Sequence, residues 1–248
     1  MHATELRNRL RGVLGFPVTP FHGDLSLNLD ALASNVEHMM KHPFCALVAA
    51  GGTGEIYSLS VDEIIDVLRM CVQAVGGKAP VVAGVAFNTP MGTEIARRAE
   101  KAGADCLLVL PPYYANAPEE GMFDYYRAIG DSTGLPLMVY SRDWAVFTPQ
   151  MVARLAECVP TLAAWKDGQG DARKYQRIMS YVGDRLAWLG GIGDDCVPAY
   201  FSVGVQAYTS SISNIAALPA VSTAAPNRGF PNPLRRPLAR LPRRLRAS

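Results

Sequence analysis

Two patterns of hydrophobic and polar positions alternate along the chain. Short apolar runs rich in Val, Leu and Ala are separated by longer stretches in which apolar residues recur every three or four positions. The first pattern is typical of buried strands and the second of amphipathic helices that cover a sheet. The apolar runs predict strands at 12–16, 46–50, 81–85, 106–110, 137–140, 162–166, 186–190 and 205–211.

The helical patterns between these runs include 30–41, 60–75, 89–102 and 148–159. Ser60 and Glu63 have the spacing of a capping box, and Thr148 precedes a proline that suits the first helical position. Eight strands that alternate with helices predict a (β/α)8 TIM barrel. A doubly wound open sheet is the alternative, but the number and spacing of the strands favour closure.

The pattern stops near residue 220. The segment Val221–Ser248 contains seven Arg, five Pro and no acidic residue. Prolines at this density leave no room for a regular helix. We therefore divide the chain into a barrel domain, 1–220, and a tail, 221–248. The tail is either a frameshifted end or a disordered basic segment.

Separating the tail changes the charge of the chain. The formal charge of the whole sequence is +2, but residues 1–220 hold 17 of the 24 basic residues and all 22 acidic ones, a charge of −5. An acidic body gives no electrostatic reason to expect a nucleic-acid partner. No apolar run approaches the ~20 residues that cross a membrane. The start, "MHATELRNRLRG", is too charged for a signal peptide. We therefore expect a cytoplasmic protein without a membrane partner.

The cysteines predict neither a metal site nor a disulfide framework. They are scattered, with no C-x-x-C pair and no histidine at ligand spacing. Most lie in apolar runs, and we interpret them as small core residues. They are Cys45, Cys71, Cys106, Cys158 and Cys196.

A glycine-rich turn, "AAGGTGE", follows the second predicted strand. It lacks the Lys-Ser/Thr of a P-loop and the spacing of a dinucleotide fingerprint. Consecutive small residues nevertheless present backbone N–H groups to an anion, and here Gly52 and Thr53 are candidates to bind a carboxylate. The alternative is a helix-capping turn with Glu55 in the first helical turn.

Lys166 ends the sixth predicted strand, which is otherwise apolar, and is expected to enter the barrel mouth. Desolvation there lowers the pKa of a lysine, and the neutral amine can form a Schiff base with a ketone. Tyr140 ends the preceding strand and is a candidate to shuttle protons. The alternatives are a surface or ion-paired lysine and a tyrosine that only packs.

Together these motifs resemble the dihydrodipicolinate synthase/N-acetylneuraminate lyase family. The resemblance runs from about Gly12 to about Ser213 and rests on "GFPVTPF", "AAGGTGE", "LPPYY", "VYSR" and "WKDG" in family order and spacing. Within the family, "AGGTGE", "VYSR" and "KDG" are most similar to the 5-dehydro-4-deoxyglucarate dehydratases. The synthase branch is expected to carry a Thr pair in the glycine turn and Glu after the lysine. Ser141 departs from the Asn expected in the dehydratase branch.

The resemblance implies a barrel of the class I aldolase type and a role for each candidate residue. Lys166 would form the Schiff base, Tyr140 would relay protons, and Gly52 and Thr53 would bind the carboxylate of a 2-keto acid. Arg142 is a candidate for the far carboxylate of a diacid, because a guanidinium pairs bidentately with carboxylates; the alternative is a loop ion pair with Asp143 or Asp167.

Five further residues are considered around the same mouth. Ser210 and Ser211 are candidates to bind substrate hydroxyls, and Thr19 is expected to line the mouth. Tyr113 and Tyr114 fall where relatives place aromatics near the site and a subunit contact, and we expect them to pack.

The implied activity is a lyase reaction on a keto-sugar diacid: dehydration and decarboxylation of 5-dehydro-4-deoxyglucarate to 2,5-dioxopentanoate, CO2 and water. The imine serves as the electron sink, so neither a metal nor an organic cofactor is expected. The alternatives are a pyruvate-dependent aldolase of a keto-deoxy sugar acid and a catalytically dead or binding barrel.

The resemblance also implies a last barrel helix, a small C-terminal helical domain and tetramers built from dimers. The sequence from Val221 onward does not continue in this way. We therefore expect a barrel without the C-terminal helical domain, poor solubility or weak activity, and a homo-oligomer only if the altered end permits it.

Overall fold

The computed structural model describes residues 1–112 and 116–216. The predictions for Tyr113 and Tyr114, for the boundary at residue 220 and for the tail Val221–Ser248 therefore lie outside the described residues.

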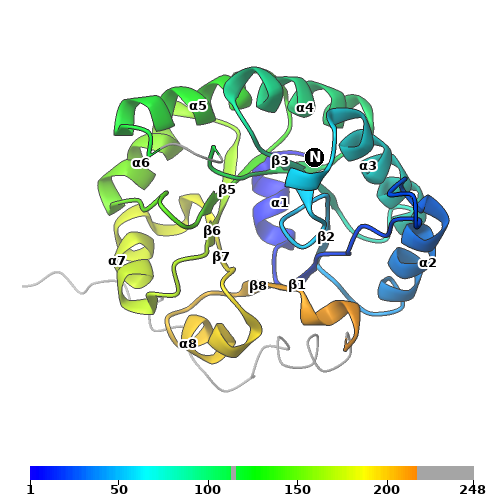
Figure 1. Ribbon diagram of the computed structural model, residues 1–248. Coiled ribbons are helices and arrows are strands. Elements are labelled where there is room, and N and C mark those ends of the chain that lie inside the picture. The colour runs from blue at the N-terminus through cyan, green and yellow to red at the C-terminus, as the bar shows by residue number, and fades with distance from the viewer. Residues whose placement is uncertain (113–115, 217–248) are drawn as a thin grey trace, which may run out of the picture.

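Eight parallel strands close into a barrel in chain order, as Figure 1 shows in a view down the barrel. Closure is made by β8 against β1, with Val13 opposite Tyr208 and Gly15 opposite Ser210. This confirms the predicted (β/α)8 barrel and excludes the open sheet. The strands are β1 (Gly12–Gly15), β2 (Ala46–Ala49), β3 (Val81–Val85), β4 (Cys106–Val109), β5 (Leu137–Ser141), β6 (Leu162–Asp167), β7 (Ala187–Gly190) and β8 (Ala207–Ser210).

A ring of helices surrounds the strands. The predicted caps are present: Ser60 and Glu63 form a capping box, and the Thr148 side chain caps the helix that begins with Pro149. The α-helices are α1 (Ala3–Arg9), α2 (Leu29–Met39), α3 (Val61–Val75), α4 (Thr89–Lys101), α5 (Glu119–Asp131), α6 (Pro149–Cys158), α7 (Ala172–Val182) and α8 (Val197–Ser202). Short 3-10 helices are η1 (Ile56–Ser58), η2 (Gly183–Arg185), η3 (Asp194–Cys196) and η4 (Ile212–Asn214).

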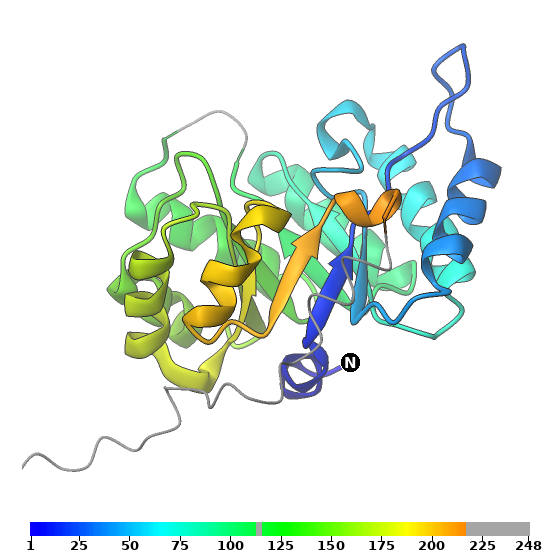
Figure 2. The same cartoon turned by 90° about the horizontal axis from the view of Figure 1, so that it is seen from below.

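Helix α1 was not predicted, and it lies at the end of the barrel where β1 begins (Figure 2). Its Leu6 is fully buried. Helix η4, which follows β8, lies at the opposite end, where the strands finish. The barrel therefore has one end covered by α1 and one end, the mouth, formed by the loops that follow the strands.

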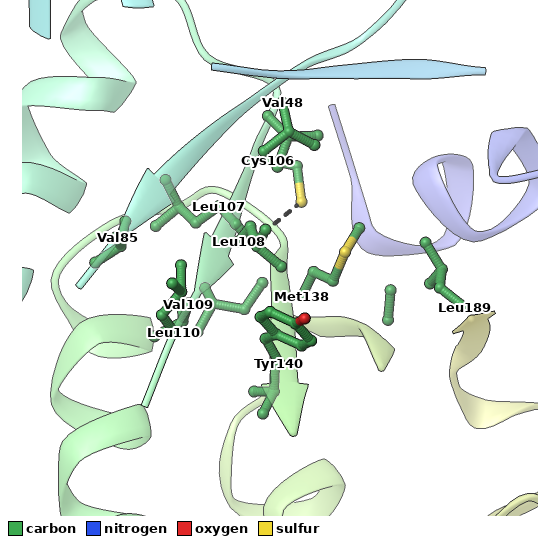
Figure 3. Close-up of a cluster of buried hydrophobic side chains, with 14 of the residues drawn as sticks. Val48, Val85, Cys106, Leu107, Leu108, Val109, Leu110, Met138, Tyr140 and Leu189 are labelled. Carbon is green, nitrogen blue, oxygen red and sulfur yellow. Dashed lines mark hydrogen bonds between the residues drawn. The ribbon is translucent and has the colours of Figure 1, made fainter. Parts of the chain in front are cut away.

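The core consists of apolar side chains inside the barrel and between strands and helices. Figure 3 shows part of it, with Met138 and Tyr140 of β5 among side chains of β4. Cys71 and Cys106 are buried as expected, whereas Cys158 is exposed at the end of α6, so the core interpretation was wrong for that cysteine. Within the two described ranges, none of the helices has the length and hydrophobicity to cross a bilayer.

Candidate active site

Lys166 lies on β6 among the side chains at the barrel mouth. Only 4% of its surface is exposed. Its Nζ lies 3.2 Å from the centroid of the Tyr140 ring and 5.2 Å from that of the Phe16 ring. These rings belong to the neighbouring strand β5, where Tyr140 pairs with Lys166, and to the residue after β1, so the amine lies between the adjacent strand and the loop that follows β1. The predicted inward orientation of the lysine agrees with this placement.

The environment of Lys166 lowers the pKa of its amine well below the usual value. Burial is the main cause, because a desolvated ammonium is disfavoured, and the positive charge of Arg142 adds to it. The carboxylate of Asp167 acts in the opposite direction. The arrangement therefore favours a neutral amine, which is the nucleophilic form of lysine.

Tyr140 is buried beside the amine, and burial raises the pKa of its phenol. Its hydroxyl donates to the carbonyl of Gly191, at 3.0 Å, at the end of β7. The ring face, not the hydroxyl, is the part of Tyr140 nearest Nζ. While the hydroxyl donates to Gly191, its oxygen keeps lone pairs and can accept a hydrogen bond from a second group at the mouth.

The glycine turn after β2 is fastened to two neighbouring segments. The Thr19 hydroxyl donates to the carbonyl of Gly54 at 2.7 Å, and the hydroxyls of Thr53 and Ser211 lie 2.7 Å apart. Glu55 precedes η1 without a capping hydrogen bond from its side chain. The turn is therefore held by its neighbours across the mouth, and the helix-capping alternative does not describe the role of Glu55.

Arg142 follows β5 and reaches the glycine turn. A Cβ placed on Gly52 would lie 3.6 Å from an Arg142 terminal nitrogen. The Nε of Arg142 donates to Asp143 at 2.6 Å, which is one of the loop ion pairs considered as an alternative. A guanidinium has five N–H donors, so this pair leaves its terminal nitrogens beside Gly52 for an anion.

The three serines near the mouth, Ser141, Ser210 and Ser211, lie in different environments. Ser211 is exposed and contacts Thr53, as described above. Ser210 is fully buried, and its Oγ accepts a hydrogen bond from the backbone N–H of Ser213 in the turn into η4. Ser141 is also buried and donates to the carbonyl of Ala145. The structure thus brings Ser211, but not Ser210, to the glycine turn.

Sequence reasoning missed two residues of the site, Phe16 and Gly191. Phe16 supplies one of the two rings that flank the amine. A Cβ on Gly191 would lie 2.6 Å from Cε of Lys166, so the lysine occupies the space that a side chain would fill. Two successive glycines, one that ends the seventh predicted strand and one that follows it, in "LGGIG", were the available signal for this close approach.

Metal-binding geometry is absent from the described ranges, which contain no group of three or more His, Cys, Asp or Glu side chains placed to hold an ion. The polar groups at the mouth instead comprise an amine, a phenol, a guanidinium and a glycine turn with a threonine. These groups suit a carbonyl compound that also carries carboxylate.

Fold and site together define a (β/α)8 barrel with a buried lysine at the end of its sixth strand. Residues 9–224 match the dihydrodipicolinate synthetase family. The chain therefore belongs to that family.

Among similar sequences, a Bradyrhizobium sp. (strain ORS 278) protein named "Probable 5-dehydro-4-deoxyglucarate dehydratase" is 40% identical over 205 residues. The match covers 82% of this chain and 65% of the relative, so this chain spans a little under two thirds of that protein. A protein of the same name from Rhizobium meliloti is 40% identical over 86% of this chain and 72% of its own length.

Solved structures agree on the fold. Dihydrodipicolinate synthase from Oceanobacillus iheyensis superposes with a TM-score of 0.85 at 25% identity, over 90% of this chain and 74% of that one. The enzyme from Bacillus clausii gives a TM-score of 0.84 at 26% identity, over 88% and 74%.

Proposed function

We propose that this chain catalyses the dehydration and decarboxylation of 5-dehydro-4-deoxyglucarate through a Schiff base on Lys166. The observation that carries the proposal is the buried Lys166 amine, held against Tyr140 and lowered in pKa. The names of the relatives from Bradyrhizobium and Rhizobium support the choice of substrate. The overall reaction gives 2,5-dioxopentanoate, CO2 and water.

In the proposed mechanism the neutral Lys166 amine attacks the ketone, and water leaves as the iminium forms. The iminium acidifies the adjacent CH2, and loss of that proton gives an enamine that expels the neighbouring hydroxyl as water. Loss of CO2 from the far carboxylate then sends electrons back to the same nitrogen. Hydrolysis releases the product and restores the lysine.

The other residues are assigned by their positions. Tyr140 is assigned the transfer of protons during formation and breakdown of the iminium: its ring packs against the amine, and its hydroxyl lies next to Lys166's other neighbour, Gly191. The glycine turn with Gly52 and Thr53 binds the carboxylate next to the ketone. Arg142 binds the far carboxylate, for which Asp143 competes as the partner already present. Ser211 is left to contact a substrate hydroxyl.

The first experiment is reduction with borohydride in the presence of substrate, followed by intact and peptide mass. A reduced adduct on Lys166 is expected, together with 2,5-dioxopentanoate and CO2 in unreduced samples. Tyr140→Phe should slow adduct formation by about 10²-fold. Arg142→Ala should weaken binding of the diacid by about tenfold or more, since it removes a charge-assisted contact.

Two other outcomes would contradict the proposal. Release of pyruvate from the sugar acid would identify an aldolase. Absence of an adduct on a chain that circular dichroism shows to be folded would favour a binding barrel. Lys166→Met serves as the control, because it must abolish any adduct that is correctly assigned.

A further inference from the structure

The side of β6 that faces the helices carries a buried polar cluster directly behind Lys166. It consists of Asp167, Tyr175 and Tyr200. We propose that this cluster is a positioning device for Lys166, in which the Asp167 carboxylate stabilises the positive charge that the Lys166 nitrogen acquires as an iminium. The inference rests on the proposed Schiff-base function and adds residues that do not touch the substrate.

Asp167 is nearly fully buried, with 4% of its surface exposed. Successive side chains of a strand point to opposite faces, so Asp167 points to the helix layer while Lys166 points into the mouth. Its Oδ2 accepts hydrogen bonds from the Tyr200 hydroxyl at 2.8 Å and from the backbone N–H of Gly170 at 3.1 Å, and the backbone N–H of Gln169 also stabilises the carboxylate. Burial raises the pKa of the Asp167 carboxyl, and the hydrogen bonds donated by Tyr200 and Gly170 act in the opposite direction because they stabilise the carboxylate.

Tyr200 reaches this carboxylate from α8. Its hydroxyl lies 3.2 Å from the Asp167 backbone carbonyl as well as 2.8 Å from the carboxylate. Its ring covers Gly190, where an added Cβ would clash with the ring carbons. The absence of a side chain at Gly190 thus lets α8 deliver a phenol to the residue after the lysine.

Tyr175 acts in a similar way on the other side of Lys166. Its hydroxyl lies 3.0 Å from the carbonyl of Trp165 and accepts from the backbone N–H of Leu189 at 3.0 Å. The rings of Tyr175 and Tyr200 meet edge to face, with centroids 6.0 Å apart. Two phenols from α7 and α8 therefore hold the backbone immediately before and immediately after the lysine.

The charge of Asp167 has no cation to neutralise it directly. It forms no salt bridge with any residue in 1–112 or 116–216. Within these ranges, the charged and titratable groups that interact with it come from five elements or their ends: Tyr200 from α8, Tyr175 from α7, Asp171 just before α7, Cys196 from η3, Tyr140 from β5, and Lys166 from its own strand. Burial of a carboxylate without an ion-pair partner lowers the stability of the fold, unless the carboxylate interacts with another charge nearby.

That other charge appears on the adjacent residue during the reaction. When the neutral amine and a ketone combine, a carbon–nitrogen bond forms, one proton is taken up, and the ketone oxygen leaves as water. The nitrogen becomes positive. Around it lie Tyr140 and Arg142 from β5 and its loop, Phe16 after β1, and Asp167 from its own strand. Asp167 is the acidic group among these that favours the cation.

Asp167→Asn tests the charge by itself. Asparagine has the same shape without the charge, and its amide oxygen can replace Oδ2 as the acceptor from Tyr200 and Gly170. The readout is the affinity for pyruvate, used as a simple keto-acid probe, from the fraction of Lys166 trapped by borohydride between about pH 6 and 10. A free cationic amine and an iminium carry the same charge, so Asp167 stabilises both equally. A neutral amine carries no charge, so there Asp167 stabilises only the iminium.

The expected result follows from that difference. Above the pH at which Lys166 loses its proton, Asp167→Asn should weaken the affinity for pyruvate by about tenfold. The reason is that an opposite charge nearby raises the pKa of a cationic group by about one pH unit, which corresponds to a tenfold change in an equilibrium constant. Below that pH the affinity should stay the same. The midpoint of the curve of pyruvate affinity against pH should move down by about one pH unit. Tyr200→Phe should change the profile in the same direction by a smaller factor.

Tyr125→Phe is the matched control. Tyr125 is an equally buried tyrosine whose hydroxyl donates to the carbonyl of Leu110 at 3.1 Å, at the end of a different strand. It should lose comparable stability without a pH-dependent change in pyruvate affinity. A uniform loss of affinity at every pH in Asp167→Asn, or no loss, would overturn the charge role. No adduct in the unsubstituted chain would instead overturn the proposed function, and with it the role of the cluster.

Discussion

At the scale of single residues, the site depends on a lysine surrounded by groups that cannot solvate it. Phe16 and Tyr140 present aromatic faces to Nζ. These rings offer weak electrostatic attraction to a cation but do not replace the hydrogen bonds of water. The chemistry of Lys166 therefore depends on how closely its neighbours approach it.

Gly191→Ala is predicted to disable the site through a single methyl group. That methyl would lie 2.6 Å from Cε of Lys166, too close for the lysine to keep its position. We expect the rate of adduct formation with a keto acid to fall by about 10²-fold, as misplacement by an ångström does elsewhere. Gly23→Ala is the control, because an added Cβ there has nothing within 4 Å. Equal rates in the two variants would show that Lys166 can move aside.

At the scale of elements, the mouth is closed where β8 returns to β1. Asn214, in η4, accepts from the N–H of Val18 at 3.2 Å and donates to the carbonyl of Phe16 at 2.7 Å. The contact between Thr53 and Ser211 joins the same region to the glycine turn. Asn214 and Ser211 therefore connect the segment that follows β8 to the loops that follow β1 and β2.

Asn214→Ala should loosen this closure. Two hydrogen bonds between β8 and β1 loops are lost, and we expect the free energy of unfolding to fall by about 1–3 kcal/mol. Adduct formation should slow as well, because Phe16 borders the Lys166 amine. Asn88→Ala provides the comparison: it removes the cap of α4, where Asn88 accepts from Met91 N–H at 3.0 Å, and costs about 1 kcal/mol. If both variants react at the same rate, the closure serves stability alone.

At the scale of the whole molecule, burial of Lys166 inside the barrel lowers the free energy of unfolding. The unfolded chain exposes that amine to water, where it is charged at neutral pH. The folded chain lowers the pKa of Lys166 well below 10.5. Between these two pKa values the unfolded state binds one more proton, so the free energy of unfolding rises with pH in this window.

Lys166→Met should therefore stabilise the protein while abolishing the adduct. We expect a gain of about 2 kcal/mol in the free energy of unfolding at pH 7, in the range found when buried charges are replaced by apolar side chains. The gain should shrink as the pH rises toward 10.5, because the unfolded lysine then loses its proton too. Urea unfolding at pH 7 and 10 measures both. Lys78→Met, at an exposed position, should show neither effect, and a constant gain at both pH values would contradict the linkage.

The sequence by itself determined the class of fold and the principal groups of the site. Short apolar runs favour buried strands, and their alternation with capped helices favours a barrel over other arrangements of the chain. A lysine that ends such a run has to face the mouth or the helices. For this reason Lys166, Tyr140 and Gly52 could be placed together before any coordinates were known.

Only the tertiary structure decided which groups touch. The packing of α1 under the barrel and the contact between Asp167 and Tyr200 each join segments that lie far apart in the chain, and no local pattern predicts these partners. Periodicity reports which face of an element is buried, but not what lies against it. That choice is made by the closure of the sheet, which brings distant segments within hydrogen-bond reach and fixes the surroundings of Lys166.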